Sequence, residues 1–308
     1  MTSNFTALSL FSSGGGLDIG FESAGFVHSG SYEILDVCCD TLRLNRPNWD
    51  ITQCDLSVKT VAPCNQVDVV HGGPPCQPFS TAGRGLGNSD HRNMWPAFTR
   101  VVNELQPMAF VAENVKGILS KRFDAFMGTY IFDALPEYSI HTITLNASDF
   151  TVPQNRNRVF FIGFRSMEDF AAYVEPAPTG SATARAVLRL PDVGFDGVVP
   201  TIRSAFTGKR NTTSILNGAS GQAVYGELGL WPNGVQLNRK RANEMQTKDG
   251  TYRLTVSDCA ALQGFSTDWI FSGCIYQILG QIGNSVPPPL SEAVARSVYR
   301  VIEENCNE

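Results

Sequence analysis

Short apolar runs alternate with helix-length patterns along the first 165 residues of the chain. Such alternation is typical of βαβ units, which build a parallel sheet with helices on its faces. A helix is also expected just before Pro107, because apolar residues recur there at i, i+3, i+4 and i+7 and proline then ends the helix. We therefore predict an α/β fold with a doubly wound, mixed but mostly parallel sheet. Its expected strands are Thr6–Phe11, Val27–Glu33, Val67–His71, Ala109–Ala112, Ile140–Leu145 and Val159–Phe164.

The alternation stops at about Ser166, and a different composition follows. Gly, Asn, Ser, Thr and Pro dominate from there to Tyr252 with little periodicity, which indicates a smaller, irregular, loop-rich region. Helical periodicity returns after three successive prolines. The chain is expected to end in an amphipathic helix whose apolar face is formed by Val294, Val298, Val301 and Ile302. With 308 residues, the chain is long enough for one large domain or two ordinary ones.

The composition excludes several classes of protein. Hydrophobic residues make up 43% and charged residues 17% of the chain, and no apolar run approaches the ~18 residues of a membrane span, so neither disorder nor membrane insertion fits. The N-terminal sequence lacks the basic flank and cleavage site of a secretory signal, which predicts a cytoplasmic protein. The eight cysteines form no C-x-x-C pair and there are four histidines, so neither a disulfide framework nor a metal site is predicted.

The charge of the chain is unevenly distributed. The formal net charge is −5 and the pI is about 5.5, so the whole molecule lacks the composition of a basic nucleic-acid binder. Between Pro200 and Thr255, however, eight basic residues stand against three acidic ones, which is a net charge of +5. From the sequence alone, this segment fits either an ordinary solvated surface or a surface that binds phosphates.

The first chemical motif is a glycine-rich turn, Phe11–Gly16, which follows the first expected strand and opens the next helix. Glycines at such a turn let the backbone approach a ligand closely, beside helix N–H groups. Glu33 closes the second expected strand about 20 residues later, where a carboxylate can accept both hydroxyls of a ribose. The spacing fits a nucleoside-bearing cofactor, although a glycine run by itself is as often only a tight turn.

The second motif, Gly72–Ser80, presents one cysteine, Cys76, among three prolines after an apolar strand. Prolines stiffen this loop, and the carboxyl end of a strand in a doubly wound sheet is where ligands bind. A lone cysteine is usually an inert buried residue. Here the rigid setting favours a nucleophilic thiol instead.

Three further motifs lie at the ends of expected elements. Glu113 follows the strand Ala109–Ala112 and can act as a general acid if burial raises its pKa, or simply cap a helix. Arg156 and Arg158 lie at i, i+2 on one side of an extended chain, so they can clamp a phosphate and a base oxygen, or pair with surface acids. The last motif, Gln281–Pro287, is a polar turn before the final helix.

The order and wording of these motifs resemble the DNA (cytosine-5)-methyltransferases. The resemblance covers most of the chain, and its most diagnostic part is the Pro-Pro-Cys-Gln-Pro-Phe-Ser stretch around Cys76. It implies a sequence-specific enzyme that transfers a methyl group from S-adenosyl-L-methionine to C5 of a cytosine flipped out of double-stranded DNA. The matching stretches are Phe11–Gly16, Gly73–Ser80, Glu113–Val115, Gln154–Val159, Leu254–Phe265 and Gly283–Val286.

The resemblance also implies a domain organisation and partners. The sheet would be of the S-adenosylmethionine-dependent methyltransferase type, in a discontinuous catalytic domain of residues 1–165 plus 254–308. Residues 166–253 would form a target-recognition domain whose basic residues contact DNA phosphates. A monomeric, bacterial or phage-borne modification enzyme is expected, cytoplasmic and associated with the nucleoid. Its partner would be double-stranded DNA. A cognate restriction endonuclease is possible but is not required for activity, and the sequence leaves its existence open.

The resemblance assigns roles to individual residues. Cys76 would add to C6 of the cytosine and Glu113 would donate a proton toward N3. Arg158 would hold O2 of the base, and Arg156 a loop or a phosphate. The residues expected to bind the cofactor are Phe11, Ser13, Gly14, Gly16, Glu33, Ile34, Asp55, Pro75, Trp95, Asn284 and Ser285. The candidates for DNA binding are Ser80, Arg84, Arg92, Gln154, Arg203, Lys209, Arg210, Arg239, Lys240 and Arg241.

The chain departs from the family pattern at several positions. Ser13 replaces a glycine of the first motif, and Gly14 is expected to supply the missing backbone freedom. These departures bear on cofactor affinity and pocket shape rather than on the reaction, because none removes an expected catalytic group. The other departures are Leu35, Asn93, Trp95 and Ala261.

Three other functions are weighed against this one. The tRNA-methylating branch of the family looks similar through the catalytic motifs, but it typically carries a Cys-Phe-Thr stretch that this chain lacks. A catalytically silent nucleic-acid-binding module would not need the intact set of Cys76, Glu113 and both arginines. A nicotinamide-dependent oxidoreductase accounts for the glycine turn and Glu33, but leaves the proline-rich cysteine loop without a purpose.

Overall fold

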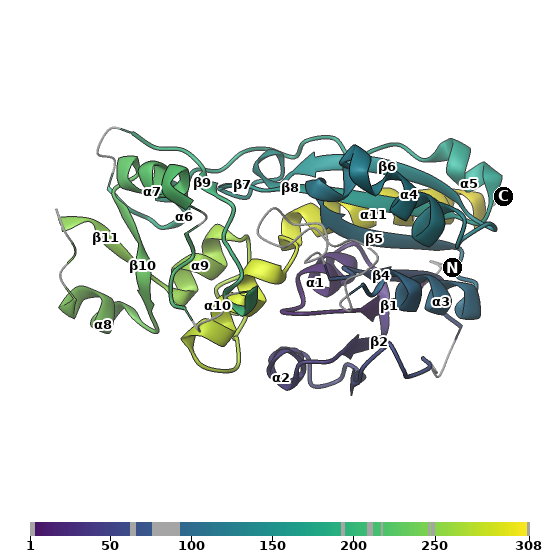
Figure 1. Ribbon diagram of the computed structural model, residues 1–308, viewed down its shortest axis with the longest axis horizontal. Coiled ribbons are helices and arrows are strands. Elements are labelled where there is room, and N and C mark those ends of the chain that lie inside the picture. The colour runs from purple at the N-terminus through teal and green to yellow at the C-terminus, as the bar shows by residue number, and fades with distance from the viewer. Residues whose placement is uncertain are drawn as a thin grey trace.

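The computed structural model describes residues 4–61, 66–75, 93–191, 195–207, 212–216, 218–245, 247 and 250–306. A seven-stranded sheet with helices on both faces forms one part of the molecule. A smaller part, from α6 (Ala184–Val187) to β11 (Tyr252–Thr255), lies at the end away from the two termini (Figure 1). Several residues predicted to act in catalysis or DNA binding lie outside the described residues: Cys76, Ser80, Arg84, Arg92, Lys209 and Arg210.

The large sheet is mixed and mostly parallel, as predicted. Its strand order is β3-β2-β1-β4-β5-β8-β6, and β8 runs antiparallel to both of its neighbours while the other pairs are parallel. All six expected strands are present, and β3, with three residues, was too short to predict. The strands are β1 (Thr6–Leu10), β2 (Val27–Glu33), β3 (Ile51–Gln53), β4 (Val69–Gly72), β5 (Ala109–Val115), β6 (Ser139–Asn146) and β8 (Asn157–Phe164).

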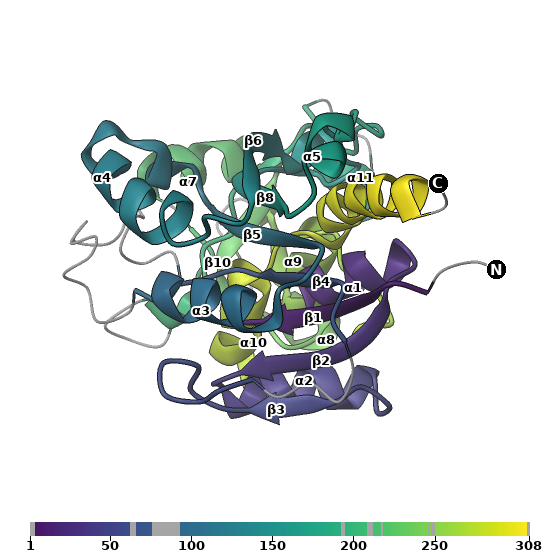
Figure 2. The ribbon, with the colours of Figure 1, turned by 90° about the vertical axis from the view of Figure 1, so that its right-hand side faces the viewer.

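Successive strand residues pack against helices on opposite faces of this sheet, which gives both faces a hydrophobic core. Val69 packs on the face covered by α1, α5 and α11, whereas Val70 packs on the face covered by α3, α4 and η4 (Figure 2). In the described ranges, no helix is long and apolar enough to cross a membrane. The covering elements are α1 (Gly16–Ser23), α5 (Met167–Ala172), α11 (Pro288–Cys306), α3 (Trp95–Leu105), α4 (Asp124–Met127) and η4 (Gly128–Phe132).

A third hydrophobic cluster joins the smaller part to the edge of the sheet. Leu42 of α2 packs in it with Ile282 of α10 and Tyr225 of the smaller part. The helices α9 and α10 lie between the two parts (Figure 1). The elements concerned are α2 (Asp36–Asn45), β7 (Gln154–Asn155), α6 (Ala184–Val187), β9 (Val199–Pro200), η6 (Ala205–Thr207), α7 (Gly218–Glu227), β10 (Leu230–Gln236), α8 (Arg239–Glu244), β11 (Tyr252–Thr255), α9 (Val256–Leu262) and α10 (Ile275–Asn284). Short turns complete the chain at η2 (Lys116–Leu119), η3 (Lys121–Phe123) and η5 (Ala147–Asp149).

The hydrophobic packing crosses the domain bounds expected from the sequence. Phe170 and Tyr173 follow Ser166, yet they pack with α11 on a face of the large sheet. In the other direction, α9 and α10 share the third cluster with the smaller part. The sequence pattern therefore changes at about Ser166, whereas the chain leaves the core of the large sheet several residues later.

Candidate active site

A hollow opens at the carboxyl-terminal edge of the central strands, where β1, β2, β4 and β5 end. This edge is the usual ligand-binding position in doubly wound sheets, so the hollow is the candidate active site. Five of the sequence motifs meet there. The described residues that line it are Phe11, Ser12, Ser13, Gly16, Leu17, Glu33, Ile34, Leu35, Gly73, Pro74, Pro75, Glu113, Val115, Arg158, Phe206, Gly283, Asn284, Ser285 and Val286.

The glycine-rich turn forms one wall of the hollow. A Cβ at Gly16 would come within 2.0 Å of the Val286 carbonyl oxygen, so this close approach requires glycine. Phe11 and Ser13 both adopt left-handed backbone, with φ angles of 58° and 51°. The expectation that Gly14 supplies the freedom lost with the family's glycine is wrong, because Ser13 itself takes the left-handed conformation.

Glu33 ends β2 and is buried against this turn. Its carboxylate accepts hydrogen bonds from the backbone N–H groups of Ser13 at 2.7 Å, Ile34 at 2.9 Å and Leu35 at 3.0 Å. Burial raises the pKa of Glu33, since desolvation outweighs these hydrogen bonds. The carboxylate is thus a fixed acceptor beside the side chain of Ile34, which is 55% exposed.

Three residues predicted to bind the cofactor, Gly14, Asp55 and Trp95, are not among the described residues that line the hollow. Asp55 is exposed, and hydrogen bonds from the side chain and backbone of Ser57 lower its pKa. Trp95 is fully buried on α3, in edge-on contact with Phe98 and Phe161. The cofactor-binding roles of Asp55 and Trp95 stay predictions. Asp55 follows Cys54, whose N–H donates to the Glu33 carbonyl at 2.9 Å, and Trp95 belongs to the hydrophobic cluster against which Phe11 packs.

The end of the chain closes the hollow on the side of the glycine-rich turn. Asn284 and Ser285 line it where α10 ends, and the Ser285 hydroxyl donates to the Gln281 carbonyl at 2.8 Å. A Cβ at Gly14 would come within 2.9 Å of Ser285 Oγ. The first and last motifs of the chain are therefore in direct contact.

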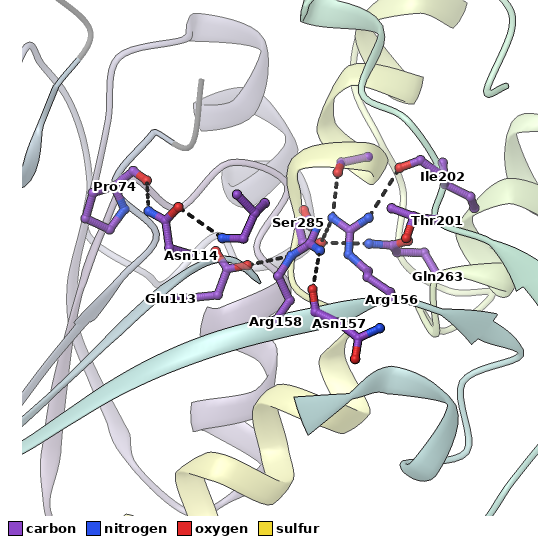
Figure 3. Close-up of polar contacts among 12 residues, drawn as sticks. Pro74, Glu113, Asn114, Arg156, Asn157, Arg158, Thr201, Ile202, Gln263 and Ser285 are labelled. Carbon is purple, nitrogen blue, oxygen red and sulfur yellow. Dashed lines mark hydrogen bonds and ion pairs between the residues drawn. The ribbon is translucent and has the colours of Figure 1, made fainter. Parts of the chain in front are cut away.

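Glu113 and Arg158 form a buried ion pair on neighbouring strands (Figure 3). Arg158 Nε lies 2.7 Å from Glu113 Oε1, and each side chain is 10% exposed. Desolvation raises the pKa of Glu113, and the charges of Arg158 and Arg156 oppose this shift without cancelling it. A carboxyl group that keeps its proton more readily than usual, at a pocket wall, has the property required of a general acid.

The segment that leads to Cys76 is tied to this ion pair. A Cβ at Gly73 would come within 3.1 Å of Glu113 Oε2, so the small residue leaves room for the carboxylate. Asn114 donates from its side-chain amide to the Pro74 carbonyl at 3.1 Å and accepts the Val115 N–H at 3.0 Å. Asn114 thereby fixes the backbone of Pro74 next to Glu113 (Figure 3).

Arg156 lies on the same side of the chain as Arg158 but does not line the hollow. It is fully buried, and its guanidinium donates to the carbonyls of Ile202 at 3.2 Å, Gly283 at 2.6 Å and Ser285 at 3.0 Å. Of the two roles predicted for it, holding a loop or holding a phosphate, this geometry favours the first. Arg156 ties the smaller part and the end of α10 to the strand that carries Arg158 (Figure 3).

Gln154 belongs to the same buried network and is not available to DNA. Its side-chain amide donates to the Leu262 carbonyl at 3.1 Å and to Gln263 Oε1 at 2.7 Å. Gln263 in turn donates to the Ser285 carbonyl at 2.7 Å. The prediction that Gln154 binds DNA is wrong, because the side chain is fully buried.

The described basic candidates of the smaller part differ in their exposure. Arg239 forms an ion pair with Asp258 and lies over the ring of Tyr252, with its guanidinium carbon 3.9 Å from the ring centroid. The positive charge of Arg239 is therefore paired with a carboxylate within the fold. Lys240 and Arg241 are exposed on α8, whereas Arg203 is partly buried beside α10.

Phe206 and Gln263 are two of the residues at the site that were not predicted individually. Phe206 lines the hollow from η6, and nothing in the sequence around it distinguishes it from a core phenylalanine. Gln263 joins the buried network behind Ser285. Its position within the Leu254–Phe265 stretch, one of the stretches that matched the family, was the available signal.

Comparison with known proteins decides the family. A family profile described as "C-5 cytosine-specific DNA methylase" matches residues 5–196 and 200–300. The chain belongs to the C-5 cytosine-specific DNA methylase family. Type II methyltransferase M.NgoMIV of Neisseria gonorrhoeae is 32% identical over 97% of this chain and 99% of its own length. Type II methyltransferase M1.HphI of Haemophilus parahaemolyticus is 31% identical over 99% of this chain and 88% of its own length.

Solved structures agree with this C-5 cytosine-specific DNA methylase fold. The Entamoeba histolytica methyltransferase EhMeth superposes with a TM-score of 0.67 at 14% identity, over 97% of this chain and 99% of that one. At this identity the likeness concerns the fold. The sheet order and the helices on both faces are thus those of the S-adenosylmethionine-dependent methyltransferase type.

The hollow of this cytosine methylase fits the cofactor that its family implies. A buried carboxylate held by backbone amides, an exposed aliphatic side chain at Ile34 and the ring of Phe11 are the groups that a ribose and an adenine require. The Ser13 hydroxyl lines the same wall, beside the thiol of Cys38.

Proposed function

We propose that this protein transfers a methyl group from S-adenosyl-L-methionine to C5 of a cytosine in double-stranded DNA, through a covalent bond between Cys76 and C6 of the base. The observation that carries the proposal is the buried Glu113–Arg158 ion pair, which shares one hollow with Glu33 and adjoins the Gly73–Pro75 segment that precedes Cys76. Family membership supports the reaction class.

Carbon 5 of cytosine is too weak a nucleophile to react unaided. A thiolate that adds to C6 forms an S–C6 bond and moves electron density through the ring toward N3. We assign this attack to Cys76. After the methyl group has been accepted, loss of the C5 proton to a base restores the C5–C6 double bond and expels the Cys76 thiolate.

Glu113 is suited to neutralise the charge that develops at N3. Its raised pKa favours the protonated form, and proton donation to N3 lets the thiol addition proceed. Arg158 is held by Glu113 through Nε and donates from Nη1 to the Asn157 carbonyl at 2.8 Å. These two contacts orient the guanidinium, and we propose that it holds O2 of the base from this position.

The cofactor would be held by the opposite wall of the hollow. We propose that Glu33 accepts the ribose hydroxyls, that Phe11 and Ile34 contact the adenine, and that Asn284 and Ser285 close the pocket from the far end of the chain. When bound, S-adenosylmethionine supplies an electrophilic methyl group. The protein contributes orientation and exclusion of water.

The base must leave the duplex to reach this pocket, at a cost of a few kcal/mol. We propose that the smaller part binds the DNA through exposed basic residues, among which Lys240 and Arg241 are the described candidates. The relatives are type II methyltransferases, which supports the expectation of a cognate restriction endonuclease.

The experiment that tests this function is expression in a bacterial host without cytosine methylation, followed by bisulfite sequencing of the host DNA beside a Cys76→Ala control. We expect cytosines protected from conversion within one short recurring motif, and none in the control. The absence of any protected cytosine would contradict DNA as the substrate. The host tRNA, analysed in the same way, would then decide between the tRNA-methylating alternative and a catalytically silent binding module.

A further inference from the structure

The smaller part of the molecule contributes one described residue to the lining of the hollow. Phe206 of η6 lines the hollow, while every other described lining residue comes from the sheet part or from α10 and the turn that follows it. An aromatic ring is therefore brought into the site by the part of the chain expected to meet DNA.

The position of Phe206 is fixed by close packing on α10. The Ser204 hydroxyl donates to the Gly280 carbonyl at 3.1 Å and accepts the Phe206 N–H at 3.3 Å. A Cβ at Gly280 would come within 2.5 Å of the Phe206 ring, and a Cβ at Gly283 within 2.4 Å of the Ser204 nitrogen. These two glycines lie at i, i+3, so one face of α10 is kept bare for the segment that carries Phe206.

The other groups of the hollow leave one requirement unmet. Glu113 and Arg158 can recognise the polar edge of a base, whereas Glu33, Phe11 and Ile34 lie on the wall assigned to the cofactor. A base taken out of the stack also loses its contact with neighbouring rings, and enzymes replace that contact with aromatic or apolar side chains. DNA bound to the smaller part would deliver a base along the wall where Phe206 lies.

We propose that Phe206 contacts the ring of the extruded cytosine and holds it in the plane required for attack at C6. This inference rests on the proposed function. It makes Phe206 a substrate-contacting residue, and it makes Gly280 a positioning residue that acts through the Phe206 ring.

The test is single-turnover methylation of a duplex that carries the recognised motif, at saturating cofactor and DNA, with cofactor affinity measured separately by calorimetry. We expect Phe206→Ala to lower the rate about tenfold or more, as loss of base–aromatic stacking predicts, and Phe206→Tyr to stay within about threefold of the unmodified protein. Gly280→Ala displaces the ring without removing it and is expected to lower the rate similarly. The dissociation constant for S-adenosylmethionine should change by less than about twofold in all three.

Matched controls are available in the chain. Phe195→Ala removes a phenylalanine that is 54% exposed, and Gly226→Ala adds a methyl group in a helix where nothing lies within 4 Å. Both should leave the rate unchanged. A Phe206→Ala rate within about twofold of the unmodified protein would overturn the inference, and so would a loss confined to cofactor affinity. If the unmodified protein methylates no DNA, the proposed function fails first, and the two failures are therefore distinguished.

Discussion

The hollow contains two buried glutamates that are held in different ways. Glu33 is held by three backbone N–H groups, and Glu113 by the side chain of Arg158. Burial raises the pKa of both. Backbone amides are neutral and are held in place by the chain, so the Glu33 carboxylate is fixed as a hydrogen-bond acceptor. The Arg158 guanidinium has several N–H donors and can bind a carboxylate and a base oxygen at once. The Glu113 end of the hollow can therefore adjust its hydrogen bonds when charge develops on the base.

The largest effect is expected from Glu113→Gln. An amide cannot deliver a proton, so single-turnover methylation should fall by roughly 10²–10⁴-fold, while the affinities for cofactor and duplex change by less than about threefold. In the unmodified protein the rate should fall as pH rises through the raised pKa of Glu113, and this limb of the profile should vanish in the variant. Glu104→Gln, at an exposed position of α3, is the control. An unchanged rate would remove Glu113 from the acid's role.

Arg156→Lys should affect folding more than chemistry. A lysine ammonium cannot reach the three carbonyls that Arg156 binds, and the buried carbonyls left without donors should lower the free energy of unfolding by about 2–4 kcal/mol. Arg158→Lys keeps an ion pair with Glu113, so it should lower the free energy of unfolding by less than Arg156→Lys does and lower the methylation rate by more. Urea denaturation measures both. Equal losses of stability would show that the two arginines are not divided in this way.

Glu33→Gln tests the comparison between the two glutamates at the end of the hollow proposed to bind the cofactor. It replaces charge-assisted hydrogen bonds by neutral ones, which should raise the dissociation constant for S-adenosylmethionine about tenfold. At saturating cofactor, the single-turnover rate should stay within about threefold of the unmodified value. Calorimetry and quench-flow measure the two quantities. A Glu33→Gln variant with normal cofactor affinity but a lower methylation rate would contradict the assignment of Glu33 to the cofactor and of Glu113 to the reaction.

The smallest effect concerns the turn beside Glu33. Ser13 has a φ angle of 51°, a conformation that costs a side-chain-bearing residue about 1 kcal/mol relative to glycine. Ser13→Gly should therefore raise the melting temperature by about 2 °C for a chain of this size, while cofactor affinity falls because a hydroxyl that lines the hollow is lost. Scanning calorimetry with and without cofactor separates the effects. A lower melting temperature of Ser13→Gly without cofactor would show that the backbone of Ser13 is not strained.

Much of the sheet could be predicted because its central strands, β1, β4 and β5, are mostly apolar and end in recognisable motifs. Glu33 was placed correctly at the end of β2, and the segments around Phe11, Glu113, Arg158 and Ser285 were correctly expected to line one site. The positions of Glu33 and Glu113 follow from local sequence and from the rule that parallel strands end at one edge of a sheet, whereas those of Arg158 and Ser285 were expected from the family resemblance.

The smaller part could not be predicted in the same way. β10 contains Pro232 and Gly234, which argue against a strand, and α7 begins at Gly218 and has little amphipathic pattern. Both elements exist because their residues pack in the third hydrophobic cluster, a contact that periodicity does not report. Arg239 is a similar case, since its partner Asp258 lies 19 residues away in the sequence.

The direction in which side chains point was the second feature that could not be predicted from the sequence. Arg156 and Arg158 share one side of the chain, yet one is enclosed by carbonyls while the other lines the hollow. Which of two equivalent positions faces a pocket depends on segments as distant as Gly283 and Ile202. Such contacts appear only once the two parts of the chain are packed together.

The most direct test of the account is covalent capture on a duplex in which the target cytosine is replaced by 5-fluorocytosine, read by intact mass in the presence of S-adenosylmethionine. Fluorine at C5 cannot leave as a proton does, so the bond between Cys76 and C6 should persist. We predict one adduct per protein for the unmodified chain and for Glu33→Gln at saturating cofactor, a strongly slowed adduct for Glu113→Gln, and none for Cys76→Ala. An adduct that forms without Cys76, or no adduct on a duplex that the protein methylates, would contradict the mechanism.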